Sequence, residues 1–554
     1  MKQAIGKINL SNIILIAILF LAVFLRFWNL GNVPPSASLD EASIGYNAYS
    51  VLKTGGDEYG EFPLISQRGY DDWRRSTYLF LVVPSVGIFG LNAVSVRLPA
   101  VILSILTVLA TYNIALLLFS KRSGFSLHFA LFTAFLLAIS PWHIYISRLG
   151  HESNACLSFL VFGVLFFLQG LKKNSWKRTL VSMTFFTLSM ISYYTGQILV
   201  PLFVAGLFFI YRKNILSIVL INKKVLTIFC IFLILLILIF WSIFSPKALI
   251  RFQGTSTFKP EAHAEMFANE VRLRNEAVVK HNIAGIVFYN RRLFPVKVFI
   301  QGYFSHFNPK WLFANSSNES FKAPNTGLLY TWLIPFIIVG IFGFLFSPFF
   351  DRKIKMLIFL WFILGPLPGS VATQAPHAMR TYNIIPVWQF FAAFGLTYTF
   401  FKLRKFRVVV LLAFFLCALL SLLAFYKNYF IIFPKEQSNS FQYALSKAIP
   451  YVLAQENNYQ KVVFSNKDNL YQSYMFYLFY SKYDPFLYQR QGGSVSGGYN
   501  ETHSFGKFEF RPIVYKKENA GELLIGNVSE LNGVKKLKAF ANLAGEEEVI
   551  VVKN

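Results

Sequence analysis

The stretch from Asn29 to Arg75 reads NLGNVPPSASLDEASIGYNAYSVLKTGGDEYGEFPLISQRGYDDWRR and lies between two long apolar runs. It carries seven of the chain's 26 acidic residues, namely Asp40, Glu41, Asp57, Glu58, Glu61, Asp71 and Asp72. The flanking runs, about 11–28 and 95–119, are each long enough to cross roughly 30 Å of hydrocarbon as a helix. The sequence therefore predicts an acid-rich loop between two membrane spans, and we expect the chemistry of the protein to concentrate there.

The composition supports a membrane environment for most of the chain. Hydrophobic residues make up 55% of the 554 residues and charged residues only 14%, a balance that excludes an ordinary water-soluble domain. The net charge of +27 raises the question of nucleic acid binding. Lys and Arg, however, fall in short clusters between apolar runs, where they face lipid headgroups. We therefore expect membrane lipids as partners and no nucleic acid.

Eleven apolar runs of about 17 to 25 residues predict transmembrane helices. They cover about 11–28, 95–119, 125–141, 154–171, 179–194, 196–211, 225–244, 326–348, 354–370, 383–401 and 407–426. The basic clusters gather on one side of these spans, which the positive-inside rule assigns to the cytoplasm. The sequence thus predicts a multi-pass protein of the plasma membrane with a cytoplasmic N-terminus.

The opposite face carries the larger segments. They are the first loop at about 29–94, a long loop at about 245–325 and everything after about 428. The tail mixes short apolar strands with a helical stretch, which predicts a small α/β domain. We expect a transmembrane domain of residues 1–428 followed by an extracytoplasmic domain of residues 429–554.

Asp40 and Glu41 follow a Pro-Pro turn and begin a predicted amphipathic helix, in which Ile44 and Tyr46 are expected to face the membrane surface. Acids at this position commonly accept hydrogen bonds from the free N–H groups of the first helical turn. The alternative is a catalytic carboxylate that takes a proton from an acceptor hydroxyl. Further along, Asp57, Glu58 and Gly60 predict a solvated turn.

A second polar cluster, Asp71 to Arg75, precedes the short apolar stretch Tyr78 to Phe89. That stretch predicts a second interfacial helix. Arg74 and Arg75 suit bidentate contact with a phosphate, and they equally suit lipid headgroups. The pair His151-Glu152 is interpreted as an interfacial ion pair.

The order of these elements matches a known pattern. The chain runs through Pro34-Pro35, Asp40-Glu41, Tyr46, Tyr49, Thr54 to Gly60, Asp72-x-Arg74, Phe89-Gly90 and Arg97-Leu98-Pro99. This order resembles the first loop and second span of the dolichyl-phosphate-mannose protein mannosyltransferase superfamily, which includes bacterial aminoarabinose transferases of lipid A. Ser140 to Arg148 and Gln374 to Pro386 resemble later loops of the same proteins.

The resemblance implies the GT-C fold, with about 11 transmembrane helices and interfacial helices in the first outside loop. It also implies transfer of a sugar from a polyprenyl-phosphate carrier to a protein, lipid or glycan acceptor. Asp40 takes the role of catalytic base by this resemblance, with Glu41 supporting it. The relatives carry a basic residue that contacts the donor phosphate, matched here by Arg74. They commonly show Lys followed by proline at that point, whereas this chain has Arg74-Arg75-Ser76.

Polar residues of the outside loops complete the expected site. The residues predicted to bind substrate are Asp72, Arg74, Arg75, Arg148, His306, His377 and Arg380. A single displacement at the anomeric carbon predicts inversion of its configuration. No histidine pair has a tight ligand spacing, so no metal is predicted, although some relatives place a divalent ion near the first-loop acids. The alternative function is a polytopic transporter or lipid-carrier flippase, which the near absence of acids inside the spans disfavours.

Overall fold

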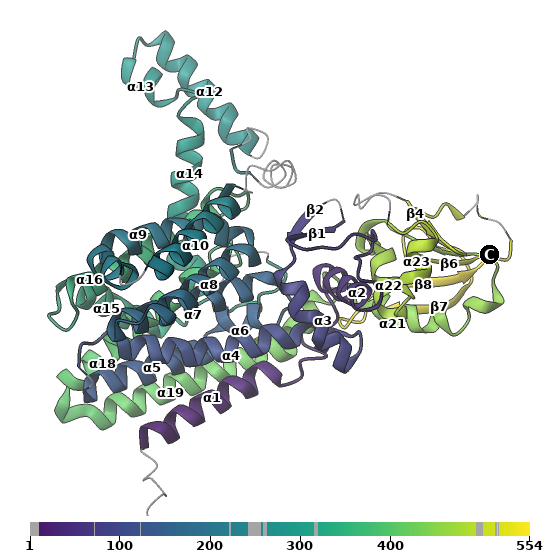
Figure 1. Cartoon of the computed structure of the whole chain (residues 1–554). Helices are drawn as coiled ribbons and strands as arrows, with labels where there is room; N and C mark the ends of the chain where they lie inside the picture. The colour runs from purple at the N-terminus through teal and green to yellow at the C-terminus, as the bar shows by residue number, and fades with distance from the viewer. Residues whose placement is uncertain are drawn as a thin grey trace, which may run out of the picture.

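The computed structural model describes residues 10–70, 72–121, 123–220, 223–241, 256–258, 263–314, 319–494, 502–515, 518 and 520–554. A bundle of long helices forms one end of the molecule and a small sheet domain forms the other (Figure 1). Asp71 and parts of the predicted loop 245–325 lie outside the described residues.

The helices of the bundle correspond one by one to the eleven predicted spans. They are α1 (Leu10–Phe27), α4 (Ala93–Leu117), α5 (Gly124–Ile139), α7 (Glu152–Lys173), α8 (Trp176–Ser192), α9 (Tyr194–Val219), α10 (Lys223–Trp241), α15 (Ile334–Phe346), α16 (Arg352–Leu364), α18 (Ile385–Lys402) and α19 (Arg407–Tyr426). Within the described part of the chain, eight helical segments are long and apolar enough to cross a membrane, or nine if α5 and the bent continuation α6 (Pro141–Ser147) count as one. The other two, α8 and α15, have 17 and 13 residues.

The outer surface of the bundle is apolar. On α19, Leu412, Leu416, Leu419 and Leu423 are all more than half exposed. Rows of exposed leucines on a long helix are stable only in a solvent as apolar as themselves, which is the lipid bilayer. The predicted multi-pass helical membrane architecture is therefore confirmed.

The first loop contains two helices and a hairpin between the spans α1 and α4. Helix α2 (Leu39–Thr54) begins with a capping box, in which Ser38 Oγ accepts the Glu41 N–H and Glu41 Oε2 accepts the Ser38 N–H. It ends at Gly55, whose φ of 80° is the left-handed conformation that closes a helix. The hairpin of β1 (Ser66–Gly69) and β2 (Asp72–Arg75) follows, and then α3 (Thr77–Phe89). Both helices predicted for this loop are present.

The C-terminal domain covers a face of α2 that the sequence analysis assigned to the membrane surface. Ile44 and Tyr46 are fully buried, and the Tyr46 ring meets the Tyr488 ring edge-on with centroids 6.1 Å apart. Figure 1 shows α22 and α23 of the sheet domain against α2. The expectation that these two side chains face lipid is therefore wrong, because aromatic residues more than 400 positions away in the chain cover them.

The sheet domain confirms the predicted small α/β unit. Its strands are β3 (Val462–Phe464), β4 (His503–Phe505), β5 (Phe508–Phe510), β6 (Leu523–Asn527), β7 (Lys536–Ala541) and β8 (Glu547–Lys553), in the spatial order β4-β5-β3-β6-β8-β7. Strand β3 pairs in parallel with β5 and β6, and the remaining pairs are antiparallel. Its principal helices are α21 (Tyr443–Leu453), α22 (Ser473–Ser481) and α23 (Pro485–Arg490).

A helical hairpin projects from the bundle between the spans α10 and α15. It consists of α12 (Ala264–Val279), α13 (Ile283–Phe288) and α14 (Phe294–Ser305). Figure 1 shows these helices standing out from the bundle, across the direction in which α1, α5 and α19 run. The end of α14 returns to the bundle beside the short helix α17 (Leu367–Ser370), where Gly302 lies against the backbone of Ser370.

Candidate active site

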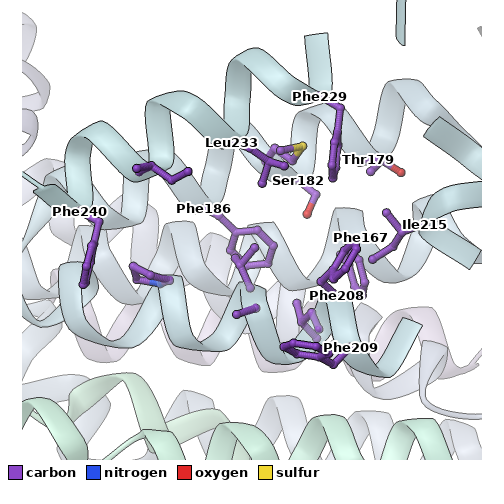
Figure 2. Close-up of a pocket in the computed structure, with 16 residues that line it drawn as sticks. Phe167, Thr179, Ser182, Phe186, Phe208, Phe209, Ile215, Phe229, Leu233 and Phe240 are labelled. Atoms are coloured by element: carbon purple, nitrogen blue, oxygen red, sulfur yellow. The ribbon is translucent and has the colours of Figure 1, made fainter. Parts of the chain in front are cut away.

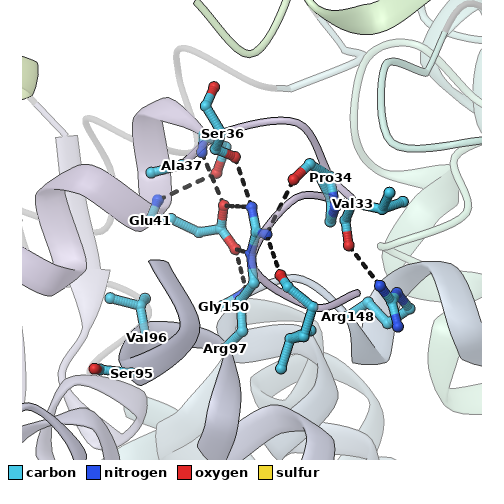
Figure 3. A network of polar contacts seen from close by, with 12 residues as sticks. Val33, Pro34, Ser36, Ala37, Glu41, Ser95, Val96, Arg97, Arg148 and Gly150 are labelled. Carbon is cyan, nitrogen blue, oxygen red and sulfur yellow. Dashed lines mark hydrogen bonds and ion pairs between the residues drawn. The ribbon is translucent and has the colours of Figure 1, made fainter. Parts of the chain in front are cut away.

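Glu41 forms a buried ion pair with Arg97 at the base of the first loop (Figure 3). Its Oε1 accepts from Arg97 Nε at 2.7 Å, and its Oε2 accepts from Arg97 Nη2 at 3.0 Å. The backbone N–H of Gly150 donates a third hydrogen bond to Oε1 at 2.8 Å. The Glu41 carboxylate is only 1% exposed. Because all of these contacts lie inside the protein, Glu41 holds the loop in place.

Two arginines bind the backbone of the turn that leads to α2. Arg97 donates its remaining hydrogen bonds to the carbonyls of Leu30, Pro34 and Ser36. Arg148 donates to the carbonyls of Leu25, Arg26 and Val33, and Figure 3 shows it pointing toward Val33. Carbonyl oxygens inside a membrane protein need such donors. Arg148, which the sequence analysis places at the substrate, thus contacts this turn.

The approach of the two loops at this point leaves no room beside Gly150. A Cβ there would lie 2.6 Å from Val96 Cγ1 and 3.2 Å from Glu41 Cγ. The N–H that binds Glu41 can therefore come this close only from a glycine.

Asp40 is the neighbour of Glu41 but points out of the buried pair. Its side chain is 41% exposed, and Oδ1 accepts from Arg74 Nη2 at 2.5 Å. The Arg74 guanidinium lies 5.6 Å from the centre of the Tyr70 ring, and that of Arg75 lies 5.0 Å from the Tyr194 ring. Aromatic faces hold guanidinium groups in this way without neutralising their charge. The β1–β2 hairpin therefore presents one oriented cation, Arg74, to Asp40, and holds a second, Arg75, against Tyr194. Asp72 begins β2 opposite Gly69.

His151 and Glu152 lie on the other side of Asp40. His151 Nδ1 accepts the Ser153 N–H at the start of α7, so its proton is on Nε2. That Nε2 is 3.8 Å from Asp40 Oδ2 and 3.4 Å from Glu152 Oε2. The sequence interpretation of an interfacial pair missed the contact with Asp40. The position of these residues three and four places after Arg148, in a loop matched to the superfamily, was the available signal.

A second polar cluster forms where α14 meets the loop before α18. His306 Nε2 accepts the His377 N–H at 3.2 Å, and His377 Nδ1 is 3.3 Å from Glu319 Oε1. Lys322 Nζ lies 3.2 Å from Glu319 Oε2, and Arg380 donates to the Thr373 carbonyl. The structure thus brings together His306, His377 and Arg380, which the sequence predicted, and adds two residues it did not.

The electrostatics of this second cluster keep both histidines uncharged. Burial, opposed in part by Glu319 and assisted by Arg380, lowers the pKa of His306 and of His377 to about 4. His151 also acts to lower the pKa of His377. The two imidazoles therefore lie within electrostatic range of each other.

The sheet domain is fastened to the first loop by a buried carboxyl group. Glu58 Oε2 accepts from Ser494 Oγ at 2.7 Å and from Tyr474 Oη at 3.2 Å, and Oε1 accepts from Asn47 Nδ2 at 3.2 Å. Burial raises the pKa of Glu58 to about 7 and that of Asp57 to about 6. The predicted turn is present, since Gly60 donates to the Asp57 carbonyl, but the two acids are buried. The expectation of a solvated turn is wrong because the distant C-terminal domain covers it.

The described residues do not fit a metal site at Asp40. No group of three or more His, Cys, Asp or Glu among them has a geometry that could hold a metal ion. The Asp40 carboxylate is instead paired with Arg74. We therefore derive no step of the chemistry through a metal.

An apolar cavity of about 450 Å³ lies between α8, α9 and α10 (Figure 2). Aromatic and aliphatic side chains line it, among them Phe186, Phe208, Phe229 and Leu233. Along α9 the cavity begins at Pro201. Pro201 is seven residues, or roughly 10 Å along the helix, beyond Tyr194, whose ring lies against the Arg75 guanidinium. The cavity therefore lies along α9 beyond the end of the helix that contacts Arg75.

Comparisons with known proteins agree with this architecture. Residues 78–243 match the profile of a family described as dolichyl-phosphate-mannose-protein mannosyltransferase. No curated protein sequence matches the chain. The crystal structure of ArnT from Cupriavidus metallidurans bound to undecaprenyl phosphate is similar to this chain, with a TM-score of 0.52 and 11% sequence identity. The match covers 97% of each chain. The apo state gives a TM-score of 0.51 and 9% identity, over 98% of this chain and 97% of that one.

The apo oligosaccharyltransferase of Archaeoglobus fulgidus is also similar, with a TM-score of 0.49 and 14% identity over 86% of this chain. The chain spans only 64% of the length of that protein. The chain therefore has the GT-C fold seen in ArnT, and its residues 78–243 are similar to the mannosyltransferase family, in agreement with the resemblance of its first loop.

Proposed function

We propose that this protein transfers a sugar from a polyprenyl-phosphate carrier to a protein, lipid or glycan acceptor on the outer face of the membrane. The observation that carries the proposal is the contrast between Asp40 and its surroundings. A half-exposed carboxylate is paired with the oriented Arg74, on a loop fixed by the buried Glu41–Arg97 pair. This arrangement suits a general base next to a departing phosphate.

The proposed reaction is a single displacement. Asp40 takes the proton of the acceptor group, whose heteroatom attacks the anomeric carbon from the face opposite the phosphate. The bond between that carbon and the phosphate oxygen breaks, its electron pair stays on the phosphate, and the configuration inverts. Arg74 holds Asp40 in the structure without substrate, and it would move to the phosphate when the donor binds. That exchange would free the carboxylate for its role as base.

The cluster of His306, His377, Lys322 and Arg380 would complete the donor site from the opposite side. Lys322 and Arg380 supply positive charge, which stabilises the phosphate as it leaves. His306 and His377 are neutral above about pH 4, so they would contact hydroxyl groups of the sugar without adding charge. The apolar cavity between α8 and α9 suits the prenyl chain, and the likeness to the structure of ArnT bound to undecaprenyl phosphate supports this assignment.

The proposed topology places the site outside the cell. The N-terminus and the short basic connections would be cytoplasmic, and the first loop and residues 429–554 extracytoplasmic. In this arrangement the C-terminal domain, which lies on α2, forms one wall of the approach used by the acceptor.

The test is turnover of a panel of radiolabelled polyprenyl-phosphate sugars by the purified protein. We expect Asp40→Asn to lower the rate by about two to four orders of magnitude, the range for loss of a general base. Glu61→Gln, which changes an exposed acid of the same loop, serves as the matched control and should keep wild-type activity. If the wild-type protein binds these lipids but releases no sugar, the proposal fails and a lipid-carrier flippase becomes the better interpretation.

A further inference from the structure

The hairpin α12–α14 exposes apolar side chains at helical spacing. On α14, Val296, Ile300 and Phe304 follow one another four residues apart and are 48 to 65% exposed. Such spacing places them on one face of the helix. Val279 and Ile283, where α12 turns into α13, are more than three-quarters exposed. The hairpin therefore has an apolar surface that no other described part of the chain covers.

The direction of the hairpin places this surface parallel to the membrane. Spans such as α1 and α5 cross the bilayer, and Figure 1 shows α14 projecting across their direction. The end of α14 carries His306, which lies in the cluster assigned to the outer side. Tyr303 Oη donates to the Ile363 carbonyl and fixes this end against α16. The hairpin thus extends sideways from the bundle near the outer boundary of the hydrocarbon.

A cationic cleft of about 560 Å³ lies at the junction of α12 and α14. Its polar lining comes from Arg274, Arg291, Arg292 and Asn290, and its floor includes Phe267 and Phe294, whose rings meet edge-on at 5.1 Å. Arg274 Nε is buried and has no hydrogen-bond partner among the residues that the structure describes. Among the described residues, no carboxylate forms an ion pair with any of these three arginines. The cleft therefore concentrates positive charge that no carboxylate in the described part of the chain pairs with.

The charge balance of the hairpin points the same way. Between Ala264 and Ser305 there are six Lys and Arg residues against three Glu. Two of the three glutamates form ion pairs within the hairpin, Glu276 with Arg272 and Glu270 with Lys297. An apolar face next to an excess of cations is typical of helices that lie in the interface of an anionic membrane.

We propose that the hairpin α12–α14 lies on the bilayer surface and that the cleft of Arg274, Arg291 and Arg292 binds the phosphate headgroup of an anionic phospholipid. The apolar row on α14 then enters the acyl region, while the arginines contact the headgroup at the level of the phosphates. A second copy of the chain fits less well, because two such clefts would bring like charges together. This assignment is independent of glycosyl transfer.

The first experiment counts lipids bound to the intact protein by native mass spectrometry, with phosphatidylglycerol and phosphatidylcholine as probes. We expect wild-type protein to prefer phosphatidylglycerol and Arg291→Gln/Arg292→Gln to weaken that binding by about 25-fold, at about fivefold for each cation near a membrane surface. The control Arg272→Gln/Lys280→Gln removes two hairpin cations outside the cleft and should retain the preference. Equal loss in both double variants, or no loss in either, would overturn the headgroup site.

A second experiment locates the apolar row. Spin labels at Val296→Cys and Ile300→Cys, in a background without the three native cysteines, are examined in vesicles of phosphatidylcholine and phosphatidylglycerol. We expect relaxation by oxygen dissolved in the lipid to exceed relaxation by a water-soluble nickel complex. Labels accessible mainly to the nickel complex would place the row in water and refute membrane docking. Strong coupling between labels on different molecules would identify a second copy as the occupant.

Discussion

Asp40 and Glu41 are adjacent in the chain, yet their carboxylates meet opposite environments. The capping box turns Glu41 toward Ser38, Gly150 and Arg97, and Asp40, rotated by about 100° around the same first turn of the helix, faces Arg74 and solvent. Two adjacent carboxylates therefore have different roles. The inner one fixes the position of the loop, and the outer one is half-exposed and paired with Arg74, as the proposed role of base requires.

At this scale we predict that Glu41→Gln destabilises the protein by about 3 to 5 kcal/mol, because it leaves the buried Arg97 guanidinium without its counter-charge. Activity should fall together with stability. The measurement is thermal unfolding in detergent combined with donor turnover. Asp40→Asn is the informative comparison, since it should abolish activity while leaving the unfolding temperature within the range of the wild-type protein. Similar unfolding temperatures for Glu41→Gln and wild type would contradict the structural role.

The sequence alone identifies only part of this site. Asp40 and Arg74 emerge from the order of residues in one loop. The partners of Glu41 do not, because Arg97 and Gly150 are 56 and 109 residues away. Glu319 and Lys322 were missed for the same reason, since only the fold brings them to His377.

At the scale of elements, Glu58 links α2 to the C-terminal sheet domain. Its carboxyl group accepts from Asn47 of α2 on one side and from Tyr474 and Ser494 of the sheet domain on the other. The free carboxyl group of glutamate has a pKa of about 4.5, and burial against Tyr474 and Ser494 raises the pKa of Glu58 to about 7. The docked state therefore binds the proton more tightly than the undocked state. It follows that this contact stabilises docking fully in acid and loses strength as the pH rises through about 7.

We predict that docking of the C-terminal domain weakens between pH 5 and pH 8 and that Glu58→Gln removes most of this dependence. A smaller slope remains from Asp57, whose pKa is raised to about 6. Hydrogen exchange of α22 at the two pH values measures docking directly. The control is Glu61→Gln, which should leave the slope as it is. Equal slopes for Glu58→Gln and wild type would show that the Glu58 carboxyl does not control docking.

Elements differ in how well the sequence predicts them. The spans were predictable because hydrocarbon forces every backbone group into a helix and requires a long apolar run. The sheet domain was harder. Helix α22 has the sequence SYMFYLFYS, whose aromatic run carries no clear helical period, and its assignment depends on packing against α2 and α21.

At the scale of the whole molecule, the apolar cavity between α8, α9 and α10 is the proposed site of the prenyl chain. We predict that Ala205→Trp, which fills the cavity lined by Phe208 and Phe229, raises the KM for long-chain donors by about tenfold. This corresponds to loss of contact with about two methylene groups. The reaction with donors of two or three isoprene units should be unaffected.

Steady-state kinetics with donors of two chain lengths tests this prediction. Ile231→Trp adds the same side chain to an exposed position of α10 that does not line the cavity, and it serves as the control. An equal effect of Ala205→Trp on long and short donors would mean that the prenyl chain binds elsewhere.

The contact between Glu58 and the C-terminal domain also sets the order in which the protein matures. Glu58 finds Tyr474 and Ser494 only 416 and 436 residues later in the chain. Ribosomes add about 5 to 20 residues per second, so the first loop would cross the membrane roughly 20 to 90 seconds before its covering domain exists. During that interval Ile44, Tyr46 and Glu58 would remain uncovered, and chaperones and proteases on that side of the membrane could reach them. A chain released before the sheet domain was complete would carry every span and still leave the face of α2 with Ile44 and Tyr46 uncovered.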